Sequence, residues 1–421
     1  MRTRGLRWAG VLLAWAVLTP SVGWAQQVGT LGLLFDVPHD ENLPPLIVRG
    51  QMDTAVNYAP PDPQLASPLY STRPESGWFF HGEYLLFRQT VPLRNQLVAS
   101  RGFLDVDGNV TGTVGTFVGS GAAALQTNQV RGPGSYQPGF EAGFGYRFED
   151  GTTVDVSWWH LTKAGYGAVA TLLPPLLQLD QPLANTFLFS PVFNFPSDFA
   201  GPTNDVAAGT GHAFGIWNAA DLMTIEFVQR NEIFDLTVRK PIFETECWRT
   251  YGLVGPRFVW FWERFKWLTV DLNINGDAAP PENTAIYTNI VSNRMYGAFC
   301  GIGNECYLGH GFSTSLDLEG ALFLNIVKER AKYERGDRHV GPERQRKRID
   351  YTTVPEAKAS LNLWWYPYEG IQVKLGYDAM AFFNTVAGQT PIDFDYSAVA
   401  PQWERVFRFL DGLNIGIAFS F

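Results

Sequence analysis

Residues 413–421 read LNIGIAFSF and end the chain on an aromatic residue. Large apolar side chains occupy alternate positions of this stretch, and small or polar ones occupy the positions between them. This period of two is that of a β-strand, whose successive side chains point to opposite faces. A wholly apolar strand face suits a barrel wall that meets lipid on one side and a lumen on the other. The stretch therefore predicts the last strand of a transmembrane β-barrel.

The composition of the whole chain agrees with this fold. Of the 421 residues only 17% are charged, whereas 14% are aromatic and 42 residues are glycine. Low charge with many aromatic residues and glycines suits a barrel with an apolar outer surface, aromatic girdles and small lumenal side chains. The net charge of -9 argues against a nucleic-acid partner.

The first 25 residues have the pattern of a cleaved signal peptide. An arginine-rich start at 1–7 precedes an apolar run at 8–18, and a small-x-small site lies before Gln26. The alternative is an uncleaved anchor helix, but the apolar run is too short to cross ~30 Å of hydrocarbon comfortably. No later run reaches the ~18 apolar residues that a membrane helix needs. We therefore expect an exported protein that is not a helical membrane protein.

Residues 26–76 are rich in proline, which disfavours regular strand pairing. We interpret them as a poorly ordered periplasmic arm, with a plug that enters the lumen as the alternative. The barrel itself is expected over 77–421.

Alternating side chains predict the strands of this barrel, and Asp150-Gly151 predicts a tight turn between two of them. If 221–241 is one strand with a bulge, the barrel has about ten strands. If 230–232 is a turn, the barrel has twelve. A secreted β-sandwich is the remaining alternative fold. The predicted strands lie at 78–88, 140–149, 154–158, 221–241, 251–271, 286–303, 312–327, 351–365, 370–383 and 413–421. The long loops predicted between them lie at 91–138, 164–219, 266–285, 328–350 and 384–410.

Several spaced motifs resemble a known family, the seventh numbered group of bacterial outer-membrane beta-barrel porins. The resemblance covers about 77–421 and implies an outer-membrane barrel and a porin, without indicating a substrate or a catalytic residue. The C-terminal strand also resembles the signal that the barrel-assembly machinery recognises in such proteins, and Leu413, Ile415, Ile417, Phe419 and Phe421 would form that signal. The family motifs are Ala220-Asp221-Leu222-Met223, Gly255-Pro256-Arg257-Phe258 with Glu263, Asn293-Arg294-Met295-Tyr296-Gly297, Glu319-Gly320 with Asn325, and Gly376-Tyr377.

Charged residues on the polar faces of the predicted strands are candidates for lining the lumen. They would form either a charge network that filters solutes or a set of ion pairs that plugs a narrow barrel. In a ten-stranded barrel we favour the plug, because open channels belong to barrels of about sixteen strands. The candidates are Glu83, Glu141, Arg147, Asp155, Asp235, Arg239, Arg257, Glu263, Lys374 and Asp378.

The sequence gives little support for catalysis. An outer-membrane hydrolase would require one of the few histidines, such as His81, His160 or His212, beside a serine or a carboxylate. The sequence contains no paired-histidine metal spacing, P-loop or GxSxG motif. We therefore expect no enzyme activity, no cofactor and no metal.

Two further features concern the three cysteines and a basic segment. Cys300 and Cys306 flank a predicted turn and could form a disulfide in the oxidising periplasm, and Cys247 could compete for Cys306. The charged run at 328–348 is either a solvated external loop or a contact with anionic lipid headgroups or polysaccharide.

The expected location is the cell outer membrane, with the arm and the C-terminus periplasmic. The expected function is passive diffusion of small solutes through a porin. The alternatives are a plugged structural or surface-interaction barrel and an outer-membrane hydrolase. The expected partners are outer-membrane lipid, the barrel-assembly machinery and, if the lumen is open, small solutes.

Overall fold

The computed structural model divides the chain into two units, Met1–Asn57 and Tyr58–Phe421. All residues that the structure describes belong to the second unit. The predicted signal peptide and nearly all of the arm lie outside the described residues. The described residues are 76–90, 93–105, 108–109, 111–113, 116–130, 136–171, 186–194, 215–218, 220–245, 247–271, 281–337, 345–368 and 370–421.

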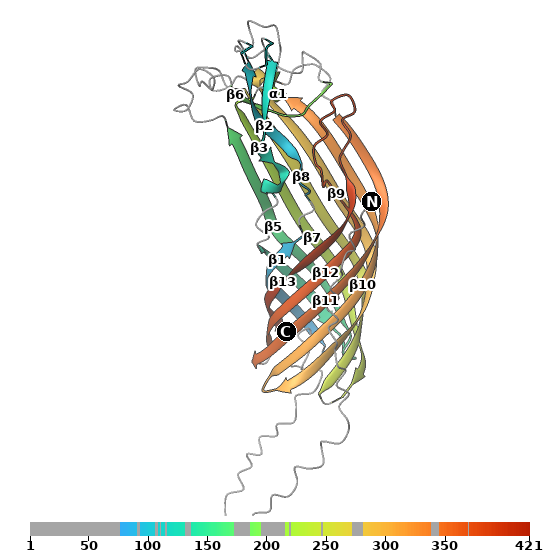
Figure 1. Ribbon diagram of the computed structural model, residues 1–421. Coiled ribbons are helices and arrows are strands. Elements are labelled where there is room, and N and C mark those ends of the chain that lie inside the picture. Colours follow the sequence, from blue (N-terminus) through green and yellow to red (C-terminus); the bar gives the residue numbers. More distant parts are fainter. Residues whose placement is uncertain are drawn as a thin grey trace, which may run out of the picture. The chain divides into compact units, whose positions relative to one another are not determined.

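Ten antiparallel strands close into a barrel, in the order β1-β13-β12-β11-β10-β9-β8-β7-β5-β4, with β4 pairing again with β1 (Figure 1). The prediction of ten strands is confirmed, and the alternative of twelve is wrong. The strands of the barrel are β1 (Gly77–Gln89), β4 (Gln137–Arg147), β5 (Thr153–Thr171), β7 (Leu222–Glu244), β8 (Trp248–Val270), β9 (Thr284–Gly309), β10 (Phe312–Arg335), β11 (Gln345–Tyr368), β12 (Ile371–Ala387) and β13 (Glu404–Ser420).

The two ends of the barrel differ. Short connections at 148–152, 245–247, 310–311 and 369–370 lie at one end, the turn end, where the chain also terminates. Long connections lie at the other end, the loop end. They include a second antiparallel sheet of order β3-β2-β6, which lies at the loop end in Figure 1. The elements of these connections are β2 (Leu97–Asp105), β3 (Thr116–Gln126), β6 (Thr186–Phe189), the helix α1 (Gly215–Asn218) and the short 3-10 helices η2 (Thr127–Val130) and η6 (Pro281–Asn283).

Most of the barrel strands are longer than predicted. β9 has 26 residues and β10 and β11 have 24 each, whereas a tilted strand crosses a bilayer with about 9–11. The loops predicted at 328–350 and 384–410 are therefore wrong in their bounds, because strand pairing continues into both ends of each. The connections that remain are 336–344 and 388–403.

β7 explains why the alternation in 221–241 changes phase. Met223, Ile225 and Phe227 are buried inside the barrel, whereas Phe234 and Leu236 are exposed on the outside. The pairing of β7 with β8 continues without a shift through this stretch. The apolar residues therefore change from the outer to the inner face of one regular strand. The predicted bulge lies instead in the neighbouring β5, where the register with β7 shifts between Leu161 and Ala164.

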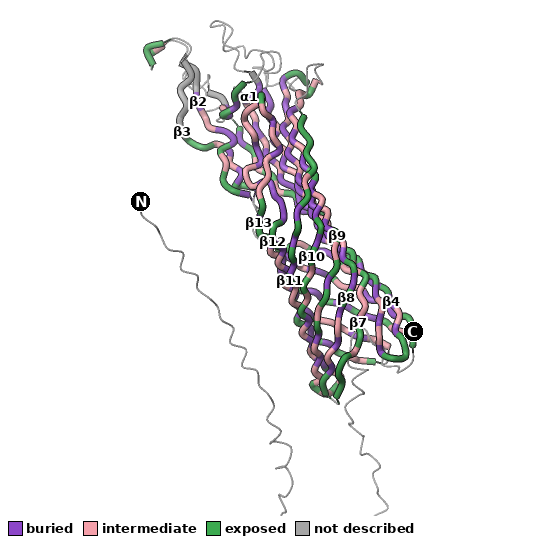
Figure 2. Tube along the Cα trace, turned by 90° about the vertical axis from the view of Figure 1, so that its right-hand side faces the viewer, coloured by how far each residue is buried: buried purple, intermediate pink, exposed green. Residues whose placement is uncertain are grey.

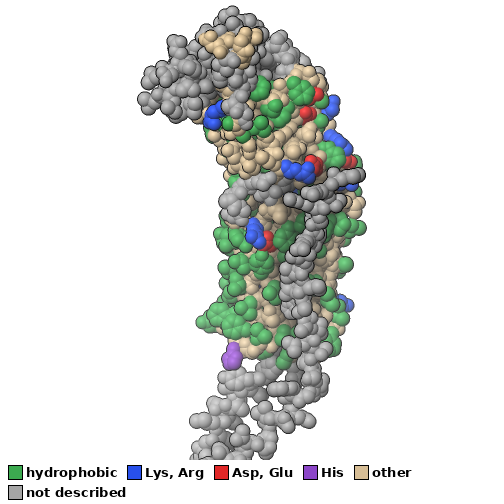
Figure 3. Space-filling view, in the orientation of Figure 1, with side chains coloured by type: hydrophobic (Ala, Val, Ile, Leu, Met, Phe, Trp, Pro, Cys, Tyr) green, Lys and Arg blue, Asp and Glu red, His purple; other side chains and the backbone are tan. Residues whose placement is uncertain are grey.

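This change of face divides the barrel wall into two zones. In the turn-end half, large apolar side chains point outward and polar ones inward, as Figure 2 shows by the alternation of exposed and buried residues along the strands. Figure 3 shows apolar side chains over this half and charged ones nearer the loop end. The terminal strand follows the pattern, with Leu413, Ile415 and Ile417 exposed and Asn414 buried. An outward apolar belt of this kind is the surface that a barrel presents to lipid.

No helix among the described residues is both long and apolar enough to cross a membrane.

Candidate functional site

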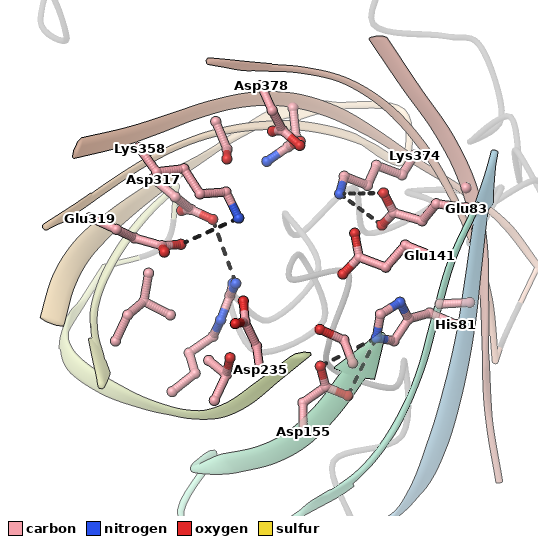
Figure 4. Close-up of a pocket in the computed structure, with 18 of the residues that line it drawn as sticks. His81, Glu83, Glu141, Asp155, Asp235, Asp317, Glu319, Lys358, Lys374 and Asp378 are labelled. Carbon is pink, nitrogen blue, oxygen red and sulfur yellow. Dashed lines mark hydrogen bonds and ion pairs between the residues drawn. The ribbon is translucent and has the colours of Figure 1, made fainter. Parts of the chain in front are cut away.

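A cavity of about 110 Å³ lies inside the turn-end half of the barrel. Seven carboxylates line it, against four lysine and arginine side chains and one histidine, so acidic groups outnumber basic ones. Its volume is well below the ~300 Å³ of a small ligand pocket. Figure 4 shows these side chains converging from several strands. The charged residues and the histidine are Glu83, Glu141, Asp155, Asp235, Asp317, Glu319, Asp378, Arg239, Arg257, Lys358, Lys374 and His81.

His81 and Asp155 form a buried pair on one side of the cavity. The Nε2 atom of His81 lies 3.3 Å from each carboxylate oxygen of Asp155. The two residues come from β1 and β5, which are separated by β4. Gly143 lies on β4 and pairs with His81 on one side and with Ser157 on the other. A Cβ atom at Gly143 would overlap the imidazole ring of His81. The absence of a side chain at this position therefore lets His81 reach across β4.

Lys374 and Glu83 form a second pair across the lumen wall. The Nζ atom of Lys374 donates to both carboxylate oxygens of Glu83, at 2.7 and 2.9 Å. Glu141 lies between this pair and His81 in Figure 4. Asp378 accepts from the Asn414 amide at 2.8 Å with one oxygen, and its other oxygen has no hydrogen-bond partner among the described residues.

Arg257 is the centre of a third group. Its guanidinium binds Asp235 through two hydrogen bonds of 2.8 Å and also binds Glu319 at 2.7 Å and Glu356 at 3.1 Å. Its Cζ atom lies 4.3 Å from the ring centroid of Phe299. A buried charge needs such complete pairing, because an uncompensated one is strongly destabilising.

A layer of apolar side chains crosses the lumen on the loop side of this network. It receives side chains from every barrel strand except β4. The rings of Phe261 and Phe382 touch with centroids 5.0 Å apart, although β8 and β12 are four positions apart around the barrel. This contact therefore spans the interior. The layer consists of Leu85, Phe87, Trp159, Leu161, Ile233, Val259, Phe261, Met295, Phe323, Val354, Met380, Phe382 and Leu410.

An ion pair crosses the lumen immediately beyond this layer. Arg408 on β13 binds Glu263 on β8 through two hydrogen bonds of 2.6 and 2.9 Å. These strands are five positions apart in the ring of ten, so they face each other across the barrel. Further toward the loop end lies a second apolar core that includes Trp217, Trp267 and Tyr333. Several sets of side-chain contacts therefore cross the described interior between the cavity and the loop end.

The structure brings most of the predicted lumenal residues together. Eight of the ten line the cavity. Glu263 points inward but lies in the separate ion pair with Arg408. Arg147 is buried but is not part of the cavity lining. The eight are Glu83, Glu141, Asp155, Asp235, Arg239, Arg257, Lys374 and Asp378.

Several interior residues were not predicted. Asp317, Glu319 and Lys358 line the cavity but are not among the predicted lumenal residues. Their strands are predicted, and the regular alternation of side chains in β10 and β11 is sufficient to place them on the lumenal face. Arg408 lies within 384–410, which the sequence predicts to be a loop. Continuing the alternation of Asn414 and Gly416 upstream would have placed Arg408 on the lumenal face.

The predicted disulfide between Cys300 and Cys306 is wrong. Both residues lie in one strand, β9, where six residues span about 20 Å. A disulfide requires Cα atoms within about 7 Å. All three cysteines are free. Cys247 is the neighbour of Cys306, because Trp248 pairs with Cys306 and the Tyr307 amide donates to the Cys247 carbonyl.

The histidines considered for hydrolysis do not come together. His81 lies in the lumen beside Asp155, whereas His160 lies on the outer face, 3.4 Å from Glu232. His212 lies outside the described residues. Within the described ranges, no group of three or more histidine, cysteine or acidic side chains has a geometry suited to a metal ion.

Comparisons with known proteins found no matching family model and no similar curated protein. The resemblance to the seventh porin group is therefore not confirmed by a family match. Among solved structures the chain is similar to the outer-membrane protease OmpT from Escherichia coli, with a TM-score of 0.36 and 8% identity over 82% of this chain and 97% of that one. It is also similar to a major outer-membrane protein from Thermus thermophilus, with a TM-score of 0.28 and 11% identity over 82% and 99% of the two chains.

A third similar structure is a mutant of the monoaromatic hydrocarbon channel TodX, with a TM-score of 0.28 and 10% identity over 85% of this chain and 93% of that one. Scores at this level carry no argument about function. The fold follows from the strand pairing and the outward apolar belt, which make this chain a transmembrane β-barrel of the bacterial outer-membrane type.

Proposed function

We propose that this protein is a closed outer-membrane barrel whose role is structural or lies in interactions of its loop end. The observation that carries the proposal is the contact of Phe261 with Phe382 across the lumen, backed by the ion pair of Arg408 with Glu263. Both contacts join strands on opposite sides of the barrel. In the proposed closed barrel, these contacts block the passage of solutes.

Passive diffusion of small solutes is the second candidate. It is favoured by the polar, largely charged lining of the turn-end cavity and by the resemblance of the sequence to a porin group. The cavity would then be the vestibule of a channel whose apolar layer opens. A hydrolase is the weakest candidate, because His81 lies inside the barrel beside Asp155 and His160 lies on the outer face beside Glu232, so the two do not form one site.

The conductance of single reconstituted molecules distinguishes the first two candidates. The mature chain would be purified from the outer-membrane fraction, and its fold would be checked by the change in gel migration on boiling in detergent. A closed barrel is expected to give no steady ionic current. A stepwise ohmic current that disappears after boiling would overturn the closed-barrel proposal. It would support the porin if Lys374→Ala also changed the ion selectivity of the current.

We propose further that the chain reaches the outer membrane through the barrel-assembly machinery, which would recognise the last strand. Phe421 is exposed at the turn end, and its amide donates to the Trp78 carbonyl. Truncation of Phe421 should lower the fraction of the protein that shows the heat-dependent gel shift. Unchanged assembly of the truncated chain would contradict this role.

A further inference from the structure

Basic side chains gather on the outer face of β7–β11, just beyond the apolar belt on its loop side. Those in β7–β10 point outward because the residues on either side of each are buried inside the barrel, such as Glu263 beside Arg264 and Glu329 beside Lys328. Lys347 in β11 pairs with Arg330 and shares the alternation of the exposed Ile349 and Tyr351. Three of them are exposed, and the other three are partly buried. We call this group the basic patch. It consists of Arg230, Arg264, Arg294, Lys328, Arg330 and Lys347.

The strand register shows how closely these residues lie. Arg264, Arg330 and Lys347 occupy one row of paired positions, in which Ile290 lies between Arg264 and Arg330. Arg230 and Lys328 occupy the next row, two residues nearer the belt. At about 4.8 Å between strands and about 3.4 Å between residues, the patch measures roughly 19 by 14 Å.

Arg294 occupies the third row, where Trp260 and Tyr351 lie on the same outer face. In the second row, the guanidinium of Arg230 lies 5.1 Å from the ring centroid of Trp262, with which it pairs. Outward tryptophans and tyrosines mark the level where a barrel meets the lipid headgroups. The basic patch therefore lies at and just beyond the headgroup level of the leaflet that surrounds the loop-end side of the belt.

Few acidic groups neutralise this patch. In the part of the chain that the structure describes, only Arg264 among its members has an ion pair, with Glu226 at 3.2 Å. The nearby Glu232 lies 3.4 Å from His160. Six cations with one paired carboxylate leave a strong positive field at the membrane surface.

We propose that the basic patch binds the phosphate-bearing headgroup of a lipid in the surrounding leaflet. Arginine forks and lysine ammonium groups are suited to phosphate oxygens. The spread of the cations over three rows suits a headgroup that carries more than one phosphate. The acyl chains of the same lipid would lie along the exposed apolar side chains directly below, which include Tyr296, Leu322 and Leu324. Each lysine or arginine near an anionic membrane surface strengthens binding about fivefold.

The test is native mass spectrometry of the detergent-solubilised full mature chain with lipid A, a bisphosphorylated glycolipid, and with its dephosphorylated form. The wild-type protein is expected to retain lipid A and to release the dephosphorylated form. The triple variant Arg294→Gln/Lys328→Gln/Arg330→Gln should bind lipid A about tenfold or more weakly. Inorganic phosphate in the same concentration range should not displace lipid A, because it lacks the acyl chains.

The matched control removes three exposed cations outside the patch, in the variant Lys163→Gln/Lys240→Gln/Arg405→Gln. It should bind lipid A as the wild-type protein does. Equal loss in the control, equal binding of the two lipid forms, or displacement by free phosphate would each overturn the proposal. Folding of every variant is checked by the heat-dependent gel shift. If the triple variant does not fold, the single variant Lys328→Gln, at an exposed position, should still weaken binding measurably.

Discussion

Arg408 and Glu263 form an ion pair through the middle of the barrel, from strands that face each other in the ring. Both side chains are almost completely buried. The pair is also well supplied with hydrogen bonds, because Gln229 donates to Glu263 at 3.0 Å and Arg408 donates to the Thr385 hydroxyl at 3.1 Å. The pair therefore ties opposite walls of the barrel together.

Replacing the arginine should destabilise the barrel strongly. Arg408→Met leaves the Glu263 carboxylate buried without a counter-charge, which typically costs about 3–5 kcal/mol of unfolding free energy. We expect a clear drop in the temperature at which the heat-dependent gel shift occurs. The double variant Arg408→Met/Glu263→Leu should recover most of the loss. Arg405→Met, at an exposed position in the same strand, serves as the control, and an equal drop in that variant would refute the prediction.

A side chain at Gly143, which pairs with His81, should lower the stability of the barrel. Gly143→Ala places a methyl group in the space of the imidazole ring, so His81 must move away from Asp155. Overpacking of this kind typically costs about 1–3 kcal/mol. Gly82→Ala is the control, because a Cβ atom at Gly82 meets nothing within 4 Å. The measurement is again the temperature of the gel shift, and equal temperatures for the two variants would show that His81 is not held as described.

Where the predictions succeeded, they depended on the alternation of side chains in the belt. In the belt, side chains alternate every two residues between apolar ones that face lipid and polar ones that face the lumen. The strands and their number therefore follow from the sequence. The same rule failed toward the loop end. There both Met223 and Phe227 point into a second core, so an apolar residue no longer indicates the outer face. For this reason the alternation does not predict the loop-end part of β13, which contains Arg408.

The sequence does not predict which lumenal charges form ion pairs, for a different reason. Which lumenal groups meet depends on the strand order and on the register of each strand pair. Arg257 and Glu263 are both lumenal candidates from the predicted strand 251–271, but Arg257 binds carboxylates from β7, β10 and β11 instead. The sequence does not predict the apolar layer either, because Phe261 and Phe382 are far apart in sequence and only the closed strand order brings their rings together.

The loop containing Asp395 should respond to acid. Hydrogen bonds from Asn194 and then Ser397 hold the pKa of the Asp395 carboxyl below its ordinary value of 3.8. A carboxyl whose pKa is lower in the folded loop stabilises that loop at any pH above its ordinary pKa. This stabilisation is lost as the pH falls through the pKa of the folded loop. Cleavage by pepsin within 388–403 should therefore begin only at a pH below 3.8. Asn194→Ala should raise that pH, and an unchanged onset would contradict the role of this hydrogen bond.

The cysteines should form only one kind of disulfide when the folded protein is oxidised. Cys300 and Cys306 are held about 20 Å apart by β9, whereas Cys247 is adjacent to Cys306 across the turn end. After treatment with a small disulfide oxidant, peptide mapping without reduction should show any intramolecular link between Cys247 and Cys306. Cys247→Ser should abolish that link, and Cys300→Ser should leave it intact. A link between Cys300 and Cys306 would require β9 to unfold at this point, and its recovery from heat-shiftable protein would contradict the strand described here.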